Sequence, residues 1–222
     1  MKPQSLPAAE PPRRPRGRPR KAPDALDEGN RRQELLRGAA RLFRDKGFAA
    51  TTTRDIAAAA GMQSGSPFYH FESKAALLFA VMEQGMRAAL RSQAQALQAA
   101  AADRASSQDL LRTLVRAHFD VLLGPGSDFI PVMLYEWRSL TPAQRADIAR
   151  LQRDYETAWA DALQALYAAG TIRADARVAR LMMLGALNWS VQWYKPRQGA
   201  SLDELTDQAM LLFLPDNSRR TA

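Results

Sequence analysis

Apolar residues recur at intervals of three and four positions along most of the chain, from about residue 29 to residue 213. This spacing places them on one face of an α-helix, and the alternation of Val, Ile and Thr that is typical of a strand does not occur. The pattern predicts about nine helices, and the longest of them come after the first three. We therefore expect an all-α fold with a helical bundle. The expected ranges are 29–47, 53–60, 64–71, 74–101, 107–123, 129–139, 142–169, 176–195 and 202–213.

Signals for helix starts support these ranges. A Ser or Thr followed three positions later by an acidic or amide residue has the spacing of a capping box, in which each side chain bonds the backbone N–H of the other residue. Pro142 stands at a first helical position, where its missing N–H costs nothing. The four pairs with this spacing are Thr52 with Asp55, Ser106 with Asp109, Thr141 with Gln144, and Ser201 with Glu204.

The first 24 residues depart from the helical pattern. Seven of them are prolines, which exclude a helix or a central strand. The sequence therefore predicts four segments. They are a basic arm over 1–24, expected to be disordered without DNA, a helix-turn-helix domain over 25–75, a ligand-binding and dimerisation domain over 76–214, and a tail over 215–222.

Positive charge is concentrated in the same arm. The 222-residue chain carries a net charge of +8, and residues 1–23 hold seven basic side chains against one acid. This asymmetry suggests that the arm meets a polyanion. The absence of cysteine excludes disulfides and cysteine nucleophiles. No secretory signal is present, and the uncharged stretch 181–194 is too short to span a bilayer, so we expect a cytoplasmic protein.

The first three predicted helices have the spacing of a helix-turn-helix unit. Gly47 ends the first helix, and Phe48 can fold back onto it. Gly61 ends the second helix, and a short connection leads to the third. In such a unit the second helix lies across the DNA backbone and the third enters the major groove. The pattern therefore predicts a reader of double-stranded DNA.

The residue types of the third predicted helix suit that role. Several side chains there offer small or planar hydrogen-bonding groups, and Gly65 permits close approach to a groove. Thr53 and Lys74 stand at opposite edges, where phosphates would pass. Pro67 is tolerable only in a first helical turn, which favours Ser64 as the N-cap. The hydrogen-bonding candidates are Gln63, Ser64, Ser66, Tyr69 and His70.

Residues 31–79 resemble the DNA-binding domain of the TetR/AcrR family. The resemblance implies that Thr53, Arg54, Ser64, Ser66, Tyr69, His70 and Lys74 face DNA, while Phe68 and Phe71 pack. The chain departs from the family at Pro67, where a large aliphatic residue is usual. The matching residues are Phe43, Gly47, Phe48, Thr52, Thr53, Ile56, Ala57, Gly61, Gly65, Phe68, Phe71, Lys74 and Leu77.

The arm contains the run PRRPRGRPRK at residues 12–21, which resembles an AT-hook. Prolines would keep it extended, Gly17 would allow close approach, and Arg16 and Arg18 would enter a narrow minor groove. The alternative is a solvated basic tail that adds affinity without sequence preference and loses it as salt rises.

Aromatic and Met residues are concentrated beyond the DNA-binding unit. A bundle interior lined by such side chains suits a bulky apolar ligand, although the same residues also build ordinary cores. Asn188 is more informative, because a buried amide beside tryptophans must find hydrogen-bond partners, either on a ligand or on a neighbouring carbonyl. The candidate ligand-binding residues are Met133, Trp137, Arg138, Trp159, Asn188, Trp189 and Trp193.

The segment 134–214 resembles a narrower TetR subgroup, through YEWRSLTPAQRADIARLQRDYETAWADAL, LGALNWSVQWYKP and LTDQAMLLFL. Regulators of that type commonly control fatty-acid or steroid degradation and respond to acyl-CoA thioesters. The resemblance implies an apolar tunnel with basic residues near its mouth; another hydrophobic effector is the alternative. The arginines available for CoA phosphates are Arg138, Arg145, Arg150, Arg153 and Arg180.

The last two predicted helices are the expected dimer interface. Two copies would form a four-helix contact related by a two-fold axis, so that the recognition helices meet a palindromic operator one DNA turn apart. The expected contacts are Leu181, Leu184, Leu205, Met210, Leu211 and Phe213.

Two other functions were weighed against a ligand-responsive repressor. An enzyme is disfavoured, because the two histidines, His70 and His118, have no metal-ligand spacing and no nucleophile or phosphate-loop motif appears. We expect no cofactor and no metal. An architectural DNA-binding protein without an effector is the remaining alternative, and it would have a filled C-terminal interior.

Overall fold

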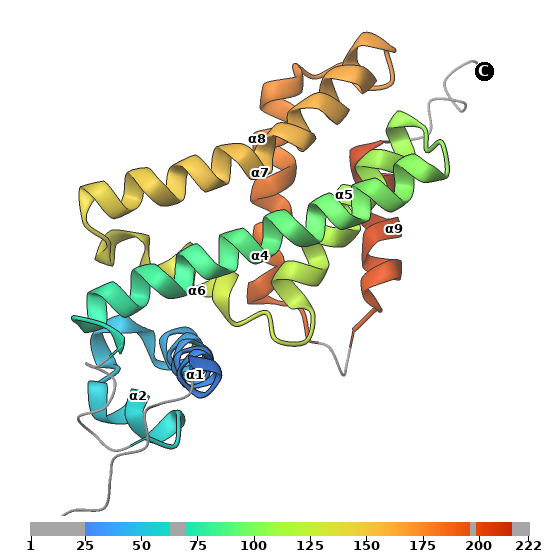
Figure 1. Ribbon diagram of the computed structural model, residues 1–222. Coiled ribbons are helices and arrows are strands. Elements are labelled where there is room, and N and C mark those ends of the chain that lie inside the picture. The colour runs from blue at the N-terminus through green and yellow to red at the C-terminus, as the bar shows by residue number, and fades with distance from the viewer. Residues whose placement is uncertain (1–24, 63–69, 196–198, 215–222) are drawn as a thin grey trace, which may run out of the picture.

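The computed structural model describes residues 25–62, 70–195 and 199–214 (Figure 1). These residues form helices joined by turns, and no strand occurs among them. The elements are α1 (Ala25–Ala50), α2 (Thr53–Ala59), α4 (Lys74–Ala102), α5 (Ser107–Leu123), α6 (Phe129–Glu136), η1 (Trp137–Ser139), α7 (Pro142–Ala168), α8 (Ala176–Trp189), η2 (Ser190–Gln192) and α9 (Leu202–Phe213). The all-α prediction is confirmed. The arm and most of the third predicted helix lie outside the described residues.

The predicted helix starts agree with the structure because their capping signals are real. All four pairs form complete capping boxes, at the starts of α2, α5, α7 and α9. At α2, for example, the N–H of Asp55 donates to the Thr52 hydroxyl over 3.1 Å, and the N–H of Thr52 donates to the Asp55 carboxylate over 2.9 Å.

Two predicted helix ends were wrong. The helix expected to end at Gly47 does break there, since Gly47 has φ +80°, but helical geometry resumes and α1 runs on to Ala50. The helix expected to reach residue 195 ends at Trp189 and tightens into a 3₁₀ turn through Gln192. Helical turns of that kind are common at helix C-termini.

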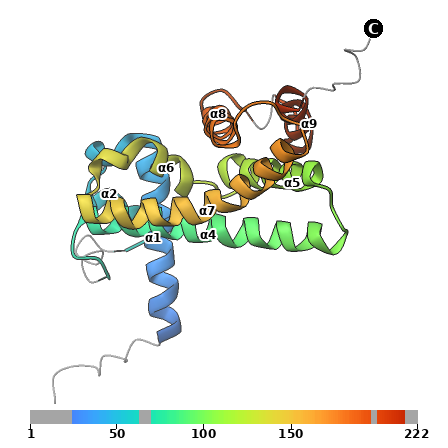
Figure 2. The same cartoon turned by 90° about the horizontal axis from the view of Figure 1, so that it is seen from above.

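The long helix α4 connects the two ends of the molecule (Figure 1). Its first turns contact α1, and its remaining length packs on α5, α6 and α7. The buried residues of all these helices form one continuous apolar core. Figure 2 shows α8 and α9 on the far side of the bundle from α4, where they pack on α7 and α5 respectively.

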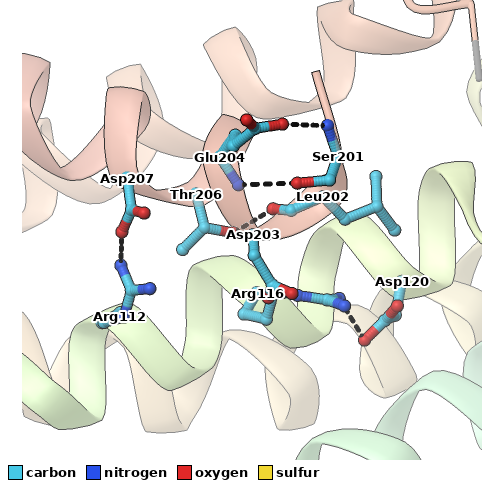
Figure 3. Close-up of polar contacts among 9 residues, drawn as sticks. All are labelled: Arg112, Arg116, Asp120, Ser201, Leu202, Asp203, Glu204, Thr206 and Asp207. Atoms are coloured by element: carbon cyan, nitrogen blue, oxygen red, sulfur yellow. Dashed lines mark hydrogen bonds and ion pairs between the residues drawn. The ribbon is translucent and has the colours of Figure 1, made fainter. Parts of the chain in front are cut away.

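Ion pairs fix α9 against α5 at the surface (Figure 3). Arg112 pairs with Asp207, and Arg116 pairs with both Asp120 and Asp203. These groups are partly exposed, so their contribution to stability is small.

Candidate DNA-binding and effector sites

The scaffold of the DNA-binding unit is a compact apolar contact between α1 and α2. The inward face of α1 is buried, from Leu35 to Phe43, and packs on Ile56 of α2. Phe48 folds back onto Phe43 with ring centroids 5.6 Å apart, as its position after Gly47 predicts. The contact orients α2 for the position across a DNA backbone that the helix-turn-helix geometry requires.

The predicted DNA-contacting residues are only partly within the described chain. Arg54 is exposed on α2, while Thr53 and His70 are half-buried. Each of these three stays a predicted contact. The predicted contacts outside the described residues are Arg16, Arg18, Gln63, Ser64, Gly65, Ser66 and Tyr69.

Lys74, which was expected to contact a DNA phosphate, forms hydrogen bonds within the protein. Its ammonium donates to the carbonyl oxygens of Phe48 at 2.7 Å and Thr51 at 2.8 Å, and lies 4.3 Å from the centre of the Phe48 ring. These contacts bind the first turn of α4 to the connection between α1 and α2. A phosphate contact by Lys74 stays a prediction, and it would compete with two carbonyls already in place.

A second contact holds the same connection from α6. The N–H of Phe48 donates to one oxygen of the Glu136 carboxylate over 2.8 Å, and the Ser139 hydroxyl donates to the other over 3.0 Å. A side chain at Gly47 would meet the same carboxylate at 3.3 Å. At the other end of α6, Arg44 pairs with Asp128. Sequence reasoning did not identify Glu136, because nothing in its local pattern signals a contact 88 positions away.

An apolar cavity of about 80 Å³ lies inside the larger domain, with walls from α4, α5, α6, α7 and α8. Two of its residues, Ile130 and Met133, come from α6. Gln152 and Glu156 add polar groups from α7, and Glu156 pairs with Arg180 at 3.1 Å. The complete lining is Met86, Ala89, His118, Val121, Ile130, Met133, Gln152, Tyr155, Glu156, Leu184 and Asn188.

A chain of buried polar groups forms one end of this cavity. His118 bonds the Tyr155 hydroxyl through Nδ1 at 2.9 Å and the Asn188 side-chain oxygen through Nε2 at 3.2 Å. Behind them, Trp159 donates to Gln93 over 3.1 Å, and Gln93 donates to the backbone oxygen of Tyr155 over 3.0 Å. These bonds join α4, α5, α7 and α8 to one another along the wall.

Burial controls the charge state of the network. It lowers the pKa of His118 to about 4, against a weaker opposite effect of the bond to Asn188, so the imidazole is neutral at pH 7. Burial also raises the pKa of Tyr155, which keeps that hydroxyl protonated. The cavity end therefore presents neutral dipoles and no charge.

The predicted ligand-binding residues divide into two groups. Met133 and Asn188 line the cavity, and Trp159 is fully buried beside it, with its ring 5.6 Å from that of His118. Trp137 is half-buried and Arg138 exposed in η1. Trp189 and Trp193 are 65% and 54% exposed, and neither lines the cavity. His118 and Tyr155, which do line it, were not among the candidates.

Comparison with known proteins decides the family. A model described as "Tetracyclin repressor-like, C-terminal domain" matches residues 104–215, and one described as "Bacterial regulatory proteins, tetR family" matches residues 35–81. The chain belongs to the TetR family. The resemblance found at the level of residues is thereby confirmed, and with it a helix-turn-helix transcriptional regulator.

Individual TetR-like proteins match nearly the whole chain. The HTH-type transcriptional repressor KstR2 of Rhodococcus jostii (strain RHA1) is 30% identical over 199 residues, covering 88% of this chain and 95% of that protein. The structure of AibR in complex with isovaleryl coenzyme A and operator DNA has a TM-score of 0.73 and 27% identity, covering 83% and 98% of the two chains. The superantigen PfiT has a TM-score of 0.70 and 36% identity, covering 86% and 100%.

This TetR family member exposes an apolar face on its last two helices. Leu181 and Leu211, two of the expected dimer contacts, are exposed, while Leu184 is buried within its own chain. Large exposed apolar patches commonly mark interfaces. The other large apolar side chains exposed on this face are Val178, Met182, Trp189 and Leu212. In the part of the chain that the structure describes, no helix is both long and apolar enough to cross a membrane.

Proposed function

We propose that this protein is a repressor that binds a palindromic operator as a homodimer and is released by an acyl-CoA thioester. The observation that carries the proposal is the cavity beside Asn188, whose wall includes α6, the helix that also holds the DNA-binding unit. KstR2 is named a repressor, and AibR is named in complex with both isovaleryl coenzyme A and operator DNA.

The route from cavity to DNA would run through α6. Ile130 and Met133 contact whatever occupies the cavity, and Glu136, one turn further, accepts the N–H of Phe48 over 2.8 Å. A ligand that pushes α6 outward therefore displaces the connection before α2. Both recognition helices of a dimer would then lose the spacing of consecutive major grooves.

The dimer would use the exposed face of α8 and α9. Two copies of that face would bury it in a four-helix contact related by a two-fold axis, as expected from the sequence. The predicted division at residues 75 and 76 falls in the first turn of α4, a helix that packs on both parts, as α6 also does. As a regulator of bacterial genes, the protein would act in the cytoplasm, by binding and not by catalysis.

An architectural DNA-binding protein without an effector is the alternative. It requires a filled interior, and the cavity of about 80 Å³ counts against it. That volume is smaller than the roughly 150 Å³ of an apolar cavity that takes up benzene. A large acyl group would therefore have to widen the bundle, and that widening is what moves α6.

Operator release tests the proposal. The palindrome would be selected from random duplexes by the full-length protein, and fluorescence anisotropy would follow its release by isovaleryl-CoA, octanoyl-CoA and palmitoyl-CoA, with free CoA as the control. We expect at least one thioester to weaken operator binding by tenfold or more, which corresponds to about 1.4 kcal/mol. Undiminished binding with every thioester would favour the architectural alternative.

A separate measurement tests the arm. Deletion of residues 1–24 is expected to lower operator affinity and to flatten its dependence on salt, because each lost phosphate contact reduces the slope of log K against log salt by about 0.9. A deletion that leaves the slope unchanged would contradict DNA contact by the arm.

A further inference from the structure

The amide of Asn188 is held at one end and open at the other. Its oxygen bonds Nε2 of His118 at 3.2 Å, while its nitrogen has no hydrogen-bond partner among the described residues. The side chain is half-buried and lines the cavity. This nitrogen is therefore free to donate to a ligand in the cavity, and a hydrogen bond from an amide to a ligand acceptor there adds affinity.

The amide oxygen of Asn188 faces the ring of His118. An amide oxygen can only accept, so in this arrangement Nε2 of His118 carries the proton and donates it to Asn188. Nδ1 then has a lone pair, and the Tyr155 hydroxyl donates to it over 2.9 Å. Rotating the amide would require the other tautomer of His118, in which Nδ1 donates to Tyr155. With its oxygen on Nε2, the amide directs its nitrogen away from the ring.

The rest of the cavity suits a short apolar chain. Six of its eleven lining residues come from α4, α5, α6 and α8 and carry aliphatic or thioether side chains. With about 80 Å³ available, less than the roughly 150 Å³ of a cavity that takes up benzene, the cavity favours a short acyl group over a long chain or a fused ring system. The six are Met86, Ala89, Val121, Ile130, Met133 and Leu184.

We infer that Asn188, oriented by His118, donates a hydrogen bond to the carbonyl oxygen of a short acyl group and thereby selects a short-chain acyl thioester. This inference rests on the proposed acyl-CoA effector. Asn188 acts as the specificity residue in direct contact with the ligand, and His118 and Tyr155 position it.

A pair of ligands that differ only at the carbonyl tests the inference. Isothermal titration calorimetry on the full-length protein would compare isovaleryl-CoA with S-isopentyl-CoA, a thioether in which CH₂ replaces C=O. We expect the wild-type protein to bind the thioether about tenfold more weakly, the effect of one hydrogen bond lost in a buried site. Palmitoyl-CoA is expected to bind more weakly than isovaleryl-CoA.

Substitution of Asn188 provides a second test of the inference. Asn188→Leu keeps the side-chain shape without donors, and the two ligands are expected to bind it within about twofold of one another. Gln95→Leu, a change of an exposed amide on α4, is the matched control and should keep the wild-type ratio. Operator binding and the melting temperature of each variant show whether it is folded, and Asn188→Asp, which keeps the shape but replaces the amide donor by an acceptor, takes its place if Asn188→Leu is not.

Each outcome has one meaning. Equal binding of thioester and thioether by the wild type, or an unchanged ratio in a folded Asn188→Leu protein, overturns the role of Asn188 and leaves acyl-CoA regulation standing. Tighter binding of palmitoyl-CoA overturns the limit on chain length. If no CoA compound binds at millimolar concentration, the effector class of the proposed function fails together with this inference.

Discussion

The neutral, buried His118 makes the stability of the protein depend on pH in a defined window. The ordinary pKa of a histidine is 6.5, and burial lowers that of His118 to about 4 in the folded protein. Between these values the unfolded chain binds a proton that the folded chain does not. Unfolding is therefore favoured as the pH falls below 6.5, and the effect is complete below 4. Above pH 6.5 it is absent.

The size of this effect follows from the two pKa values. Their difference corresponds to about 3 kcal/mol in total, of which about 2 kcal/mol is lost between pH 7 and pH 5. We would measure urea unfolding by tryptophan fluorescence at both pH values, at one protein concentration, for the wild type and for His118→Gln. Between pH 7 and pH 5, the free energy of unfolding is expected to fall by about 2 kcal/mol more in the wild type than in the variant.

The variant serves as the control for every other titrating group. Glu156 and its partner Arg180 lie near His118 and are present in both proteins, as are the capping carboxylates. Their contributions cancel in the difference. The reasoning would be refuted if the wild type and His118→Gln lost the same free energy of unfolding between pH 7 and pH 5, to within about 0.5 kcal/mol. Equal losses would mean that His118 takes up its proton in the folded protein as easily as in the unfolded one.

Three further predictions concern single contacts. Glu136→Ala leaves the Phe48 N–H without its acceptor. In calorimetry the variant should bind the effector within about twofold of the wild type, but in anisotropy the effector should release less of it from the operator. Full release would contradict the α6 route. Thr52→Ala should cost about 1 kcal/mol in urea unfolding through loss of the α2 cap, with Thr52→Ser as the neutral control. Leu212→Glu, at a side chain 78% exposed, should give a monomer by light scattering, whereas a persistent dimer would exclude this face as the interface.

The helices were predictable because their signals are local. Each capping box lies within four residues, and the helical period of apolar residues needs only a short window. Gly47 was predicted to end the first helix, and its positive φ does break the helix there, although α1 continues beyond it. The resumption of α1 to Ala50 was not predictable, since the Phe48 N–H in that turn is held by Glu136 from α6.

The effector site was predictable in part. Asn188 stood out because an amide in an apolar helix requires partners, and those partners are His118 on α5 and, through it, Tyr155 on α7. The partners of His118 could not be identified from the sequence, because they are 37 and 70 positions away from it. Trp189 and Trp193 were predicted from their residue type alone, and both are more than half exposed, Trp189 at the end of α8 and Trp193 just after the 3₁₀ turn.

The eight residues of α6 contact both the candidate effector cavity and the DNA-binding unit. One side of the helix supplies Ile130 and Met133 to the cavity, and its last residue holds the DNA-binding unit. Thermodynamic linkage makes the coupling reciprocal. If an effector weakens operator binding by some factor, the operator weakens effector binding by the same factor. Regulatory DNA thus acts as an antagonist of the metabolite. A cell that carries more operator copies would need a higher concentration of effector before its genes respond.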